Sequence, residues 1–115
     1  MYILNWKGDF DAAHRLPDYD GKCANLHGHT WKVEVEIKTK ALIEDRFVLD
    51  FTVLKQIVNT LDHKYLNDLI EVPTAENIAK YFWLAIGIID GSGLWESISV
   101  KVYEDERSSI TYVAN

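Results

Sequence analysis

Three of the four histidines in this 115-residue chain stand where predicted strands begin or end. His27 and His29 flank Gly28 just before an alternating segment, and His14 ends an apolar, aromatic one. If the extended backbone begins at His27, residues two apart project to the same side. Three neutral imidazoles with one open position form a catalytic zinc site, whereas closed structural sites use four ligands rich in cysteine. The pattern predicts zinc at His14, His27 and His29; a short His-x-His pattern also fits ordinary surface or hydrogen-bonded histidines.

Cys23 is the only cysteine and stands four residues before His27. It excludes a disulfide within the chain and leaves three interpretations: an inert buried thiol, a fourth zinc ligand or a reactive thiolate. A neighbouring cation would favour the thiolate. The two active interpretations differ only in whether the sulfur touches the metal.

Asp62 and His63 are the remaining pair with acid–base potential. Histidine titrates near neutral pH, and a carboxylate partner would fix its tautomer. Adjacent residues do not share a helix face, so the pair requires the preceding helix to have ended. The alternative is a histidine at a helix C-terminus that interacts with the helix dipole.

Glu104 continues the even-numbered apolar face of a predicted strand that holds Val100 and Val102. A buried carboxylate is costly unless it is paired. Either Glu104 lies just past the strand in solvent, or it awaits a ligand rich in donors. A guanidine-like edge with two parallel N–H groups would satisfy it with two hydrogen bonds.

The elements that must position these side chains follow from hydrophobic periodicity and capping residues. Asp50 and Thr74 can each cap a helix whose apolar residues recur at helical spacing. Gly8 is a predicted bulge, and 15–25 is a predicted loop. Alternation and β-formers predict strands at 2–13, 30–40, 94–104 and 110–113.

The order strand, strand, helix, helix, strand, strand (ββααββ) predicts an α+β fold, a four-stranded antiparallel sheet with two helices on one face. No repeat or linker interrupts the chain, so residues 1–115 are predicted to form one domain. Four strands in an open sheet leave exposed edges that a small chain cannot cover. We therefore expect association with further copies.

Composition excludes several classes of partner. Twelve Lys and Arg against eighteen Asp and Glu give a formal charge of -6, which disfavours a nucleic-acid partner. The longest apolar stretch, 81–89, is far shorter than the roughly 20 residues that span a bilayer, so no membrane anchor is expected. The lone cysteine and the lack of a secretory signal favour a cytoplasmic location.

Six short motifs follow one another along nearly the whole chain. They are Phe-x-Ala-Ala-His-Arg-Leu at 10–16, Cys-x-x-x-His-Gly-His at 23–29, Asp-Phe-x-x-Leu-Lys at 50–55, Leu-Asp-His-x-x-Leu-Asn at 61–67, Pro-Thr-x-Glu-Asn at 73–77 and Val-x-Glu at 102–104. Together they resemble the family of 6-pyruvoyl-tetrahydropterin and 6-carboxytetrahydropterin synthases. The resemblance implies the tunnelling fold, in which three subunits close a barrel and two trimers stack into a homohexamer.

The resemblance also implies a site at subunit interfaces. It assigns Zn²⁺ to the three histidines, the catalytic base to Cys23 and a proton relay to Asp62 and His63. Glu104 would bind the amino-pyrimidine edge of a pterin, with help from Thr74. The implied substrate is the small molecule 7,8-dihydroneopterin triphosphate, from which triphosphate is eliminated.

Two branches of the family share this chemistry. In the carboxy branch the side chain is cleaved and acetaldehyde is released, supplying a precursor of deazaguanine-modified tRNA bases, as in the queuosine pathway; in the pyruvoyl branch the three-carbon side chain is kept. The compact Cys-x-x-x-His-Gly-His spacing and short length favour the carboxy branch. Rival functions are a dihydroneopterin aldolase-like activity and a non-catalytic pterin-binding module with a closed structural zinc site.

The chain departs from the family pattern in one loop and shows no obvious triphosphate cradle. Arg46 and Phe47 stand where a Gly-Met pair is common, in a loop without an assigned role. The basic residues available for the triphosphate, each of which also fits a solvated surface charge, are Arg15, Lys22, Lys64 and Arg107.

Overall fold

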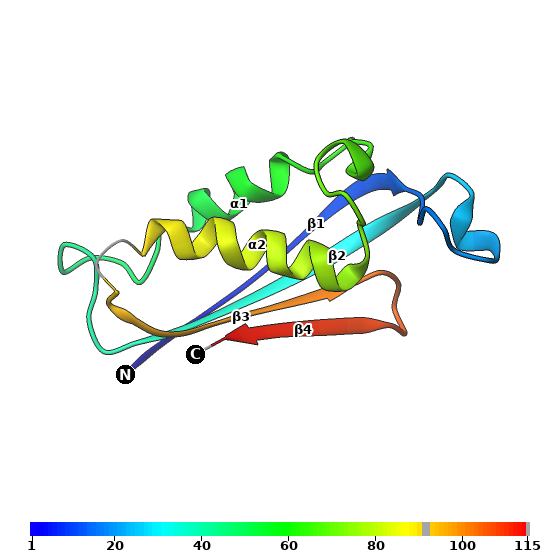
Figure 1. Ribbon diagram of the computed structural model, residues 1–115. Coiled ribbons are helices and arrows are strands. Elements are labelled where there is room, and N and C mark those ends of the chain that lie inside the picture. Colours follow the sequence, from blue (N-terminus) through cyan, green and yellow to red (C-terminus); the bar gives the residue numbers. More distant parts are fainter. Residues whose placement is uncertain (91–92, 115) are drawn as a thin grey trace.

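A computed structural model, which describes residues 1–90 and 93–114, has one antiparallel sheet covered on one face by two helices (Figure 1). The spatial order of its strands is β1-β2-β3-β4. The elements are β1 (Tyr2–His14), β2 (His27–Thr39), α1 (Phe51–Asn59), α2 (Ala75–Ile89), β3 (Trp95–Tyr103) and β4 (Ser109–Ala114), with short 3₁₀ turns η1 (Lys22–Ala24) and η2 (Leu66–Asp68). The predicted fold class and element order are confirmed.

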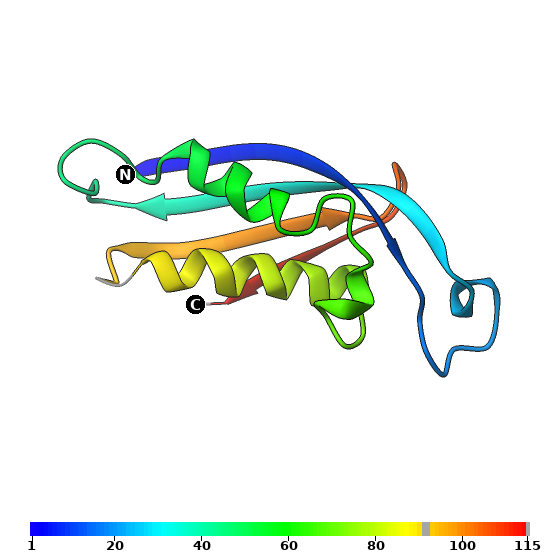
Figure 2. The same ribbon diagram turned by 90° about the horizontal axis from the view of Figure 1, so that it is seen from above.

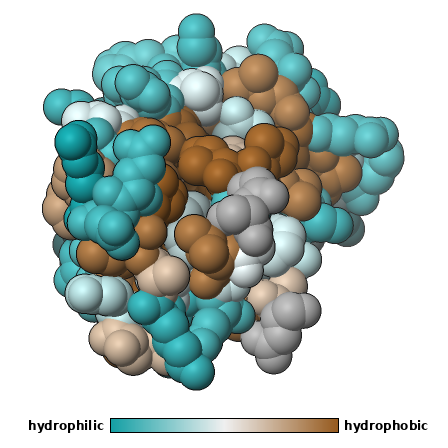
Figure 3. Space-filling model, turned by 90° about the vertical axis from the view of Figure 1, so that its left-hand side faces the viewer, coloured by the Kyte–Doolittle hydropathy of each residue, from teal (hydrophilic) through white to brown (hydrophobic). Residues whose placement is uncertain are grey.

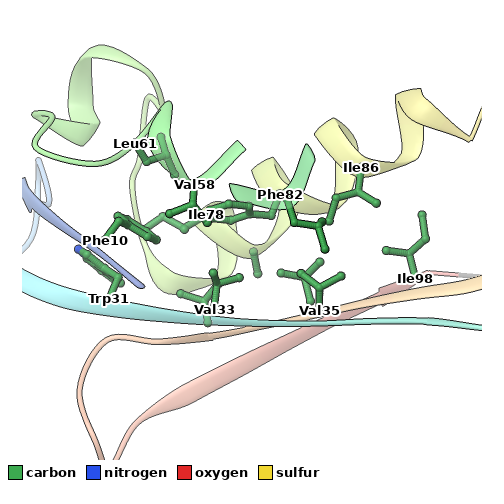
Figure 4. Packing of buried hydrophobic residues seen from close by; sticks show 14 of the residues in the cluster. Phe10, Trp31, Val33, Val35, Val58, Leu61, Ile78, Phe82, Ile86 and Ile98 are labelled. Carbon is green, nitrogen blue, oxygen red and sulfur yellow. The ribbon is translucent and has the colours of Figure 1, made fainter. Parts of the chain in front are cut away.

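The hydrophobic core lies between the sheet and the helices (Figure 4). Even-numbered residues of β1 and odd-numbered residues of β2 point inward, as the alternation predicts. At the end of the core that carries the histidines, the rings of Phe10 and Trp31 stack with centroids 6.2 Å apart. Both side chains are almost fully buried, so this end of the sheet has a rigid apolar floor.

Both helices begin at the predicted capping residues. The Asp50 carboxylate accepts a hydrogen bond from the Thr52 amide at 2.9 Å, and the Thr74 hydroxyl accepts one from the Asn77 amide at 3.2 Å. Each bond satisfies one of the amides that a helix N-terminus leaves without a partner. The α1 helix ends at Asn59, so the segment carrying Asp62 and His63 is free to follow the sheet.

The predicted bulge at Gly8 is wrong. Pairing of β1 with β2 runs without a break through Gly8 and Val33, and the one register shift in the described pairing of β2 lies between Lys38 and Thr39. Gly8 has a steric role instead, because a Cβ there would lie 2.4 Å from Cη2 of the Trp6 ring. The two residues share a face of β1, and the missing side chain leaves room for the indole.

The sheet extends beyond its helical cover at the end that carries the predicted site. Figure 2 shows β1 and β2 continuing past the helices into the loop at 15–26. At the opposite end, exposed apolar side chains gather among polar ones (Figure 3). They include Ile3, Phe47 and Phe51, which line a cavity of about 570 Å³. In the described part of the chain, no helix combines the length and apolarity needed to cross a membrane.

Candidate functional site

Strand register brings the three predicted histidines together at one end of the sheet. The last residue of β1, His14, pairs with the first residue of β2, His27, and Ala12 pairs with His29. All three imidazoles therefore project to the inner face. Their ring centroids are 4.5, 4.8 and 5.2 Å apart. Trp31 lies beneath them, with its ring centroid 4.9 Å from that of His14.

Two of these histidines have a tautomer set by backbone carbonyl groups. Nδ1 of His14 lies 2.8 Å from the Pro73 oxygen, and Nδ1 of His27 lies 2.7 Å from the Asn25 oxygen. A carbonyl oxygen only accepts, so Nδ1 of each ring must carry the hydrogen, and in the neutral ring Nε2 then presents a lone pair. The two Nε2 atoms face each other at 2.9 Å. Two opposed lone pairs repel unless a shared proton or a metal cation lies between them.

The third histidine offers a ring nitrogen that has no hydrogen-bond partner in the described part of the chain. Nε2 of His29 is buried and makes no hydrogen bond within the described residues. Oε1 of Glu104 lies 3.1 Å from it, close enough for electrostatic attraction but outside hydrogen-bonding directions. His14, His27, His29 and Glu104 each offer a ligand atom within 4.8 Å of the others. Three imidazole nitrogens and a carboxylate are a donor set that zinc accepts, so the residues fit such an ion.

Burial keeps His14 in the form that binds metal. Its pKa is lowered from the ordinary value of 6.5, first by burial and also by His27 and His29, although the Pro73 carbonyl and Glu104 act the other way. A ligand imidazole must be neutral, so protons compete less for this nitrogen than for that of an exposed histidine. The contact with Pro73 also orients the ring, as backbone carbonyls commonly do for metal-binding histidines by accepting from the nitrogen that does not bind the metal.

Glu104 lies immediately after β3, and one of the two alternatives placed it there in solvent. The structure places it past the strand but not in open solvent. Its side chain is 33% exposed and turns toward His29. The register explains this placement, because Tyr103 pairs with Lys32 and the next residue therefore lies across from Trp31. Sequence periodicity placed Glu104 on the inner face; only the pairing of β2 with β3 brings it to the histidines.

Asp62 and His63 form a separate pair on the outer edge of β1. Oδ2 of Asp62 lies 3.0 Å from Nδ1 of His63, and Oδ1 accepts a hydrogen bond from the Asp11 amide at 2.9 Å. The His63 amide donates to the Asp11 carbonyl, and His63 has a φ of 58°. The pKa of Asp62 is lowered, chiefly by the Asp11 amide and then by His63. The geometry is that of a carboxylate orienting an exposed imidazole.

Cys23 and Thr74 do not join either cluster within one chain. Cys23 lies half-buried in η1, and among the described residues its sulfur belongs to neither group of close ligand atoms. Its carbonyl accepts a hydrogen bond from the Leu16 amide at 2.8 Å. The Thr74 hydroxyl caps α2, next to the Pro73 carbonyl that orients His14.

A cavity of about 610 Å³ borders both clusters. It is lined by β1 and β2 residues that include His29, and by His63, Lys64 and Tyr65. Within one chain this cavity is wide open to solvent, so a further wall is needed for it to enclose a small molecule. Of the basic residues considered for a triphosphate, Lys64 lines this cavity.

The chain is similar to known proteins over nearly its whole length. The family model described as "6-pyruvoyl tetrahydropterin synthase" matches residues 3–115. A 6-carboxy-5,6,7,8-tetrahydropterin synthase from Synechocystis sp. is 37% identical, over 97% of this chain and 93% of that protein. A 6-pyruvoyl tetrahydrobiopterin synthase from Drosophila melanogaster is 33% identical over 96% of this chain and 78% of its own length.

Among solved structures, that of Caenorhabditis elegans 6-pyruvoyl tetrahydropterin synthase matches with a TM-score of 0.77 and 24% identity. The match covers 99% of this chain and 96% of that one. At this identity the likeness bears on the fold of one subunit, and it confirms the four-stranded antiparallel sheet with two helices that such synthases share.

Proposed function

Because the chain belongs to the 6-pyruvoyl tetrahydropterin synthase family, we propose that it is a zinc-dependent lyase acting on 7,8-dihydroneopterin triphosphate. The observation that carries this proposal is the pair of Nε2 atoms of His14 and His27 facing each other at 2.9 Å, with the buried Nε2 of His29 beside them. A metal cation bound by these three nitrogen atoms would remove the repulsion between their lone pairs. Zinc bound there supplies Lewis acidity that stabilises negative charge on the oxygens of the substrate side chain.

The remaining residues divide the proton transfers between them. Cys23, as thiolate, removes a proton from carbon on the substrate side chain. His63, oriented by Asp62, delivers or accepts the other protons. The 3.0 Å contact between Asp62 and His63 supports this role, because it fixes which ring nitrogen faces the substrate.

Glu104 is assigned to the pterin ring and Thr74 to its support. A carboxylate matches the two parallel N–H groups of an amino-pyrimidine edge. To test the assignment, Glu104→Ala is compared with the parent chain for KM and for zinc content. We expect a raised KM with zinc retained. Because the carboxylate lies 3.1 Å from Nε2 of His29, a variant that loses zinc with KM unchanged would make Glu104 a metal ligand instead.

The proposed site is shared between subunits of a homohexamer, a dimer of trimers. Within one chain, Cys23 stands apart from the ligand clusters found among the described residues. A neighbouring subunit that brings its own Asp62 and His63 to Cys23 would complete the site. The open edges of β1 and β4 support such an assembly, because joining them would close the sheet into a barrel.

The favoured product is 6-carboxytetrahydropterin, with release of acetaldehyde, in a deazaguanine or queuosine-type pathway in the cytoplasm. The Synechocystis relative named for that product supports this choice. The alternative product is 6-pyruvoyl-tetrahydropterin, and the Drosophila relative supports it. The charge of -6 supports a small-molecule substrate over a nucleic acid.

The decisive experiment is product analysis with the zinc-loaded chain. Dihydroneopterin triphosphate is supplied, and triphosphate, acetaldehyde and the pterin product are measured. Equal amounts of triphosphate and acetaldehyde are expected. Triphosphate without acetaldehyde would assign the pyruvoyl reaction, and turnover of only the unphosphorylated pterin would assign an aldolase. No turnover of either pterin would overturn the lyase proposal.

The rival proposal of a non-catalytic module makes a different prediction about the metal. A closed structural site needs Cys23 as the fourth ligand, with a zinc–sulfur distance of about 2.3 Å. X-ray absorption at the zinc edge distinguishes sulfur from nitrogen and oxygen neighbours. We expect a shell of nitrogen and oxygen alone.

A further inference from the structure

β1 is an edge strand of the sheet, but at the end that carries the site its outer side is hydrogen-bonded to the segment at 62–67. The Asp11 amide donates to Oδ1 of Asp62, and the His63 amide donates back to the Asp11 carbonyl at 2.6 Å. The Ala13 amide then donates to the Lys64 carbonyl at 3.1 Å. The segment therefore forms a short ladder on alternate residues of β1, as a further strand would.

The ladder ends on a side chain. The parallel bridge of Ala13 with Tyr65 is the last backbone pairing of this segment with β1, because the chain then turns into η2 at Leu66. There the Asn67 side chain accepts a hydrogen bond from the Arg15 amide at 3.0 Å and donates one to the Arg15 carbonyl at 2.8 Å. We call these two bonds the Asn67 clasp. A carboxamide carries the same donor and acceptor as a peptide group, so it extends the ladder by one residue.

The Asn67 clasp holds the backbone of Arg15, the residue that follows the proposed zinc ligand His14. His14 lies between Ala13 and Arg15, whose outward-facing backbone groups are both bonded to the 62–67 segment. The ring of His14 is held separately by the Pro73 carbonyl. Without the clasp, β1 would keep its pairing with β2 and its bonds to the segment at Asp11 and Ala13, but the backbone after His14 would lose its bonds to the segment.

We propose that Asn67 is a positioning residue that fixes the His14 end of β1 to the segment carrying Asp62 and His63. The inference rests on the proposed function, because it takes His14 as a zinc ligand and the pair as a proton relay. Asn67 touches neither substrate nor metal in this account. It acts through the Arg15 backbone. Its effect is to hold the histidine cluster and the Asp62–His63 pair in a fixed position relative to each other along the edge of β1.

The test compares two substitutions at Asn67 in the full chain. Asn67→Asp is nearly isosteric and keeps an acceptor for the Arg15 amide, but it has no N–H for the Arg15 carbonyl. Asn67→Ala removes both bonds. Zinc affinity is measured by competition with a chromophoric chelator, and His14→Ala shows the loss expected when a ligand is removed. We expect both Asn67 variants to bind zinc about 10- to 100-fold more weakly than the parent, the usual loss when a group that supports a metal ligand is removed.

Two further measurements separate positioning from general stability. Hydrogen exchange of the Arg15 amide in the metal-free chain should accelerate at least about tenfold in Asn67→Ala, because that amide loses its partner. In the zinc-saturated variants, kcat should fall with KM nearly unchanged, since the pterin-binding residue Glu104 lies elsewhere. Asn5→Ala is the control, because Asn5 is exposed near the other end of β1. It should leave the zinc affinity, the exchange rate of the Arg15 amide and kcat unchanged.

The possible failures are distinguishable. If both Asn67 variants fold and bind zinc within about twofold of the parent, the inference is overturned, whatever the parent's activity. If Asn67→Ala fails to fold, Asn67→Asp decides by the same criterion. A parent chain that binds zinc but turns over no pterin would refute the proposed function, while a loss of zinc affinity in the variants would still support the positioning role.

Discussion

The candidate metal centre depends on hydrogens that two backbone carbonyls place. The Pro73 and Asn25 oxygens each hold an Nδ1 hydrogen, and this leaves the Nε2 atoms of His14 and His27 as opposed acceptors. Burial and the neighbouring histidines keep His14 neutral. The residues are thus prepared for a cation by their surroundings and not by their identity alone.

Removing the Cys23 thiol is expected to abolish turnover without disturbing the metal. Cys23→Ala should lower kcat by at least about 100-fold, because general base catalysis contributes that much to rate. Zinc content and sedimentation should match the parent, since in the proposed role the thiol contributes to the reaction barrier only. Retained activity would remove Cys23 from the mechanism, and loss of zinc would make it a ligand.

The Asp62 carboxylate gives a pH dependence with a defined sign. Its pKa in the folded chain lies below the ordinary 3.8, first because of the Asp11 amide and then because of His63. The folded chain therefore binds fewer protons at this group than the unfolded chain. The resulting stabilisation is present above pH 3.8 and is lost as the pH falls through the lower folded-state pKa.

We expect Asp62→Asn to be less stable than the parent near neutral pH, with a difference that narrows in acid. Urea denaturation of both chains over a pH series measures the free energy of unfolding. A difference that stays constant as the pH falls would show that the Asp62 charge does not contribute.

At the scale of elements, β1 is the strand that organises the site. It carries His14 at its end, pairs with β2 along its whole length, and receives the 62–67 segment on its free edge. Its one glycine at an inward position makes room for a large ring, since a Cβ on Gly8 would lie 2.4 Å from Trp6. Packing on the strand is therefore as specific as its pairing.

Gly8→Ala is expected to destabilise the fold by about 1–3 kcal/mol, the usual cost of forcing an extra methyl group into a packed position. In a double-mutant cycle with Trp6→Ala, the two effects should not add, because the second change removes the clash. Urea denaturation provides the measurement. Gly87→Ala is the matched control: it lies in α2 with its nearest contact at 3.9 Å, and it should stabilise by about 1 kcal/mol. Additive effects of Gly8→Ala and Trp6→Ala would contradict the steric explanation.

At the scale of the whole molecule, a single chain leaves strand edges, one face of the sheet and a group of apolar side chains exposed. It measures 49 × 24 × 24 Å, with the sheet open at β1 and β4 and its helices on one face only. Open edges and the exposed apolar group around Phe47 and Phe51 both favour contact with further copies. In the proposed hexamer, the same contact between subunits would also complete the active site.

We expect sedimentation equilibrium to yield the mass of six chains at micromolar concentration, with trimers as the species that appears on dilution. The physical reason for a ring is that joining the open part of β1 in one chain to β4 of the next pairs the strand edges, whereas a dimer built on one shared edge leaves two edges open. A monomer that retains lyase activity would refute the shared site.

Local features could be predicted from the sequence because they depend on neighbouring residues. Alternating side chains indicated the strands, and Asp50 and Thr74 marked the helix starts, since a cap binds amides only two or three residues away. The grouping of His27 with His29 follows from the two-residue period of a strand. Six ordered motifs indicated the family, and with it the roles assigned to the remaining residues.

The approach of Glu104 to His29, the opposed nitrogens of His14 and His27, and the Asn67 clasp needed the tertiary structure. Each joins residues brought together by strand register or by the path of a turn, and a shift of one residue in register would reverse the face of every side chain involved. Gly8 shows the same limit: its spacing fits a bulge, and only the position of the Trp6 ring reveals a steric need for glycine. Periodicity determines which way a side chain points, but pairing between distant segments determines what it meets.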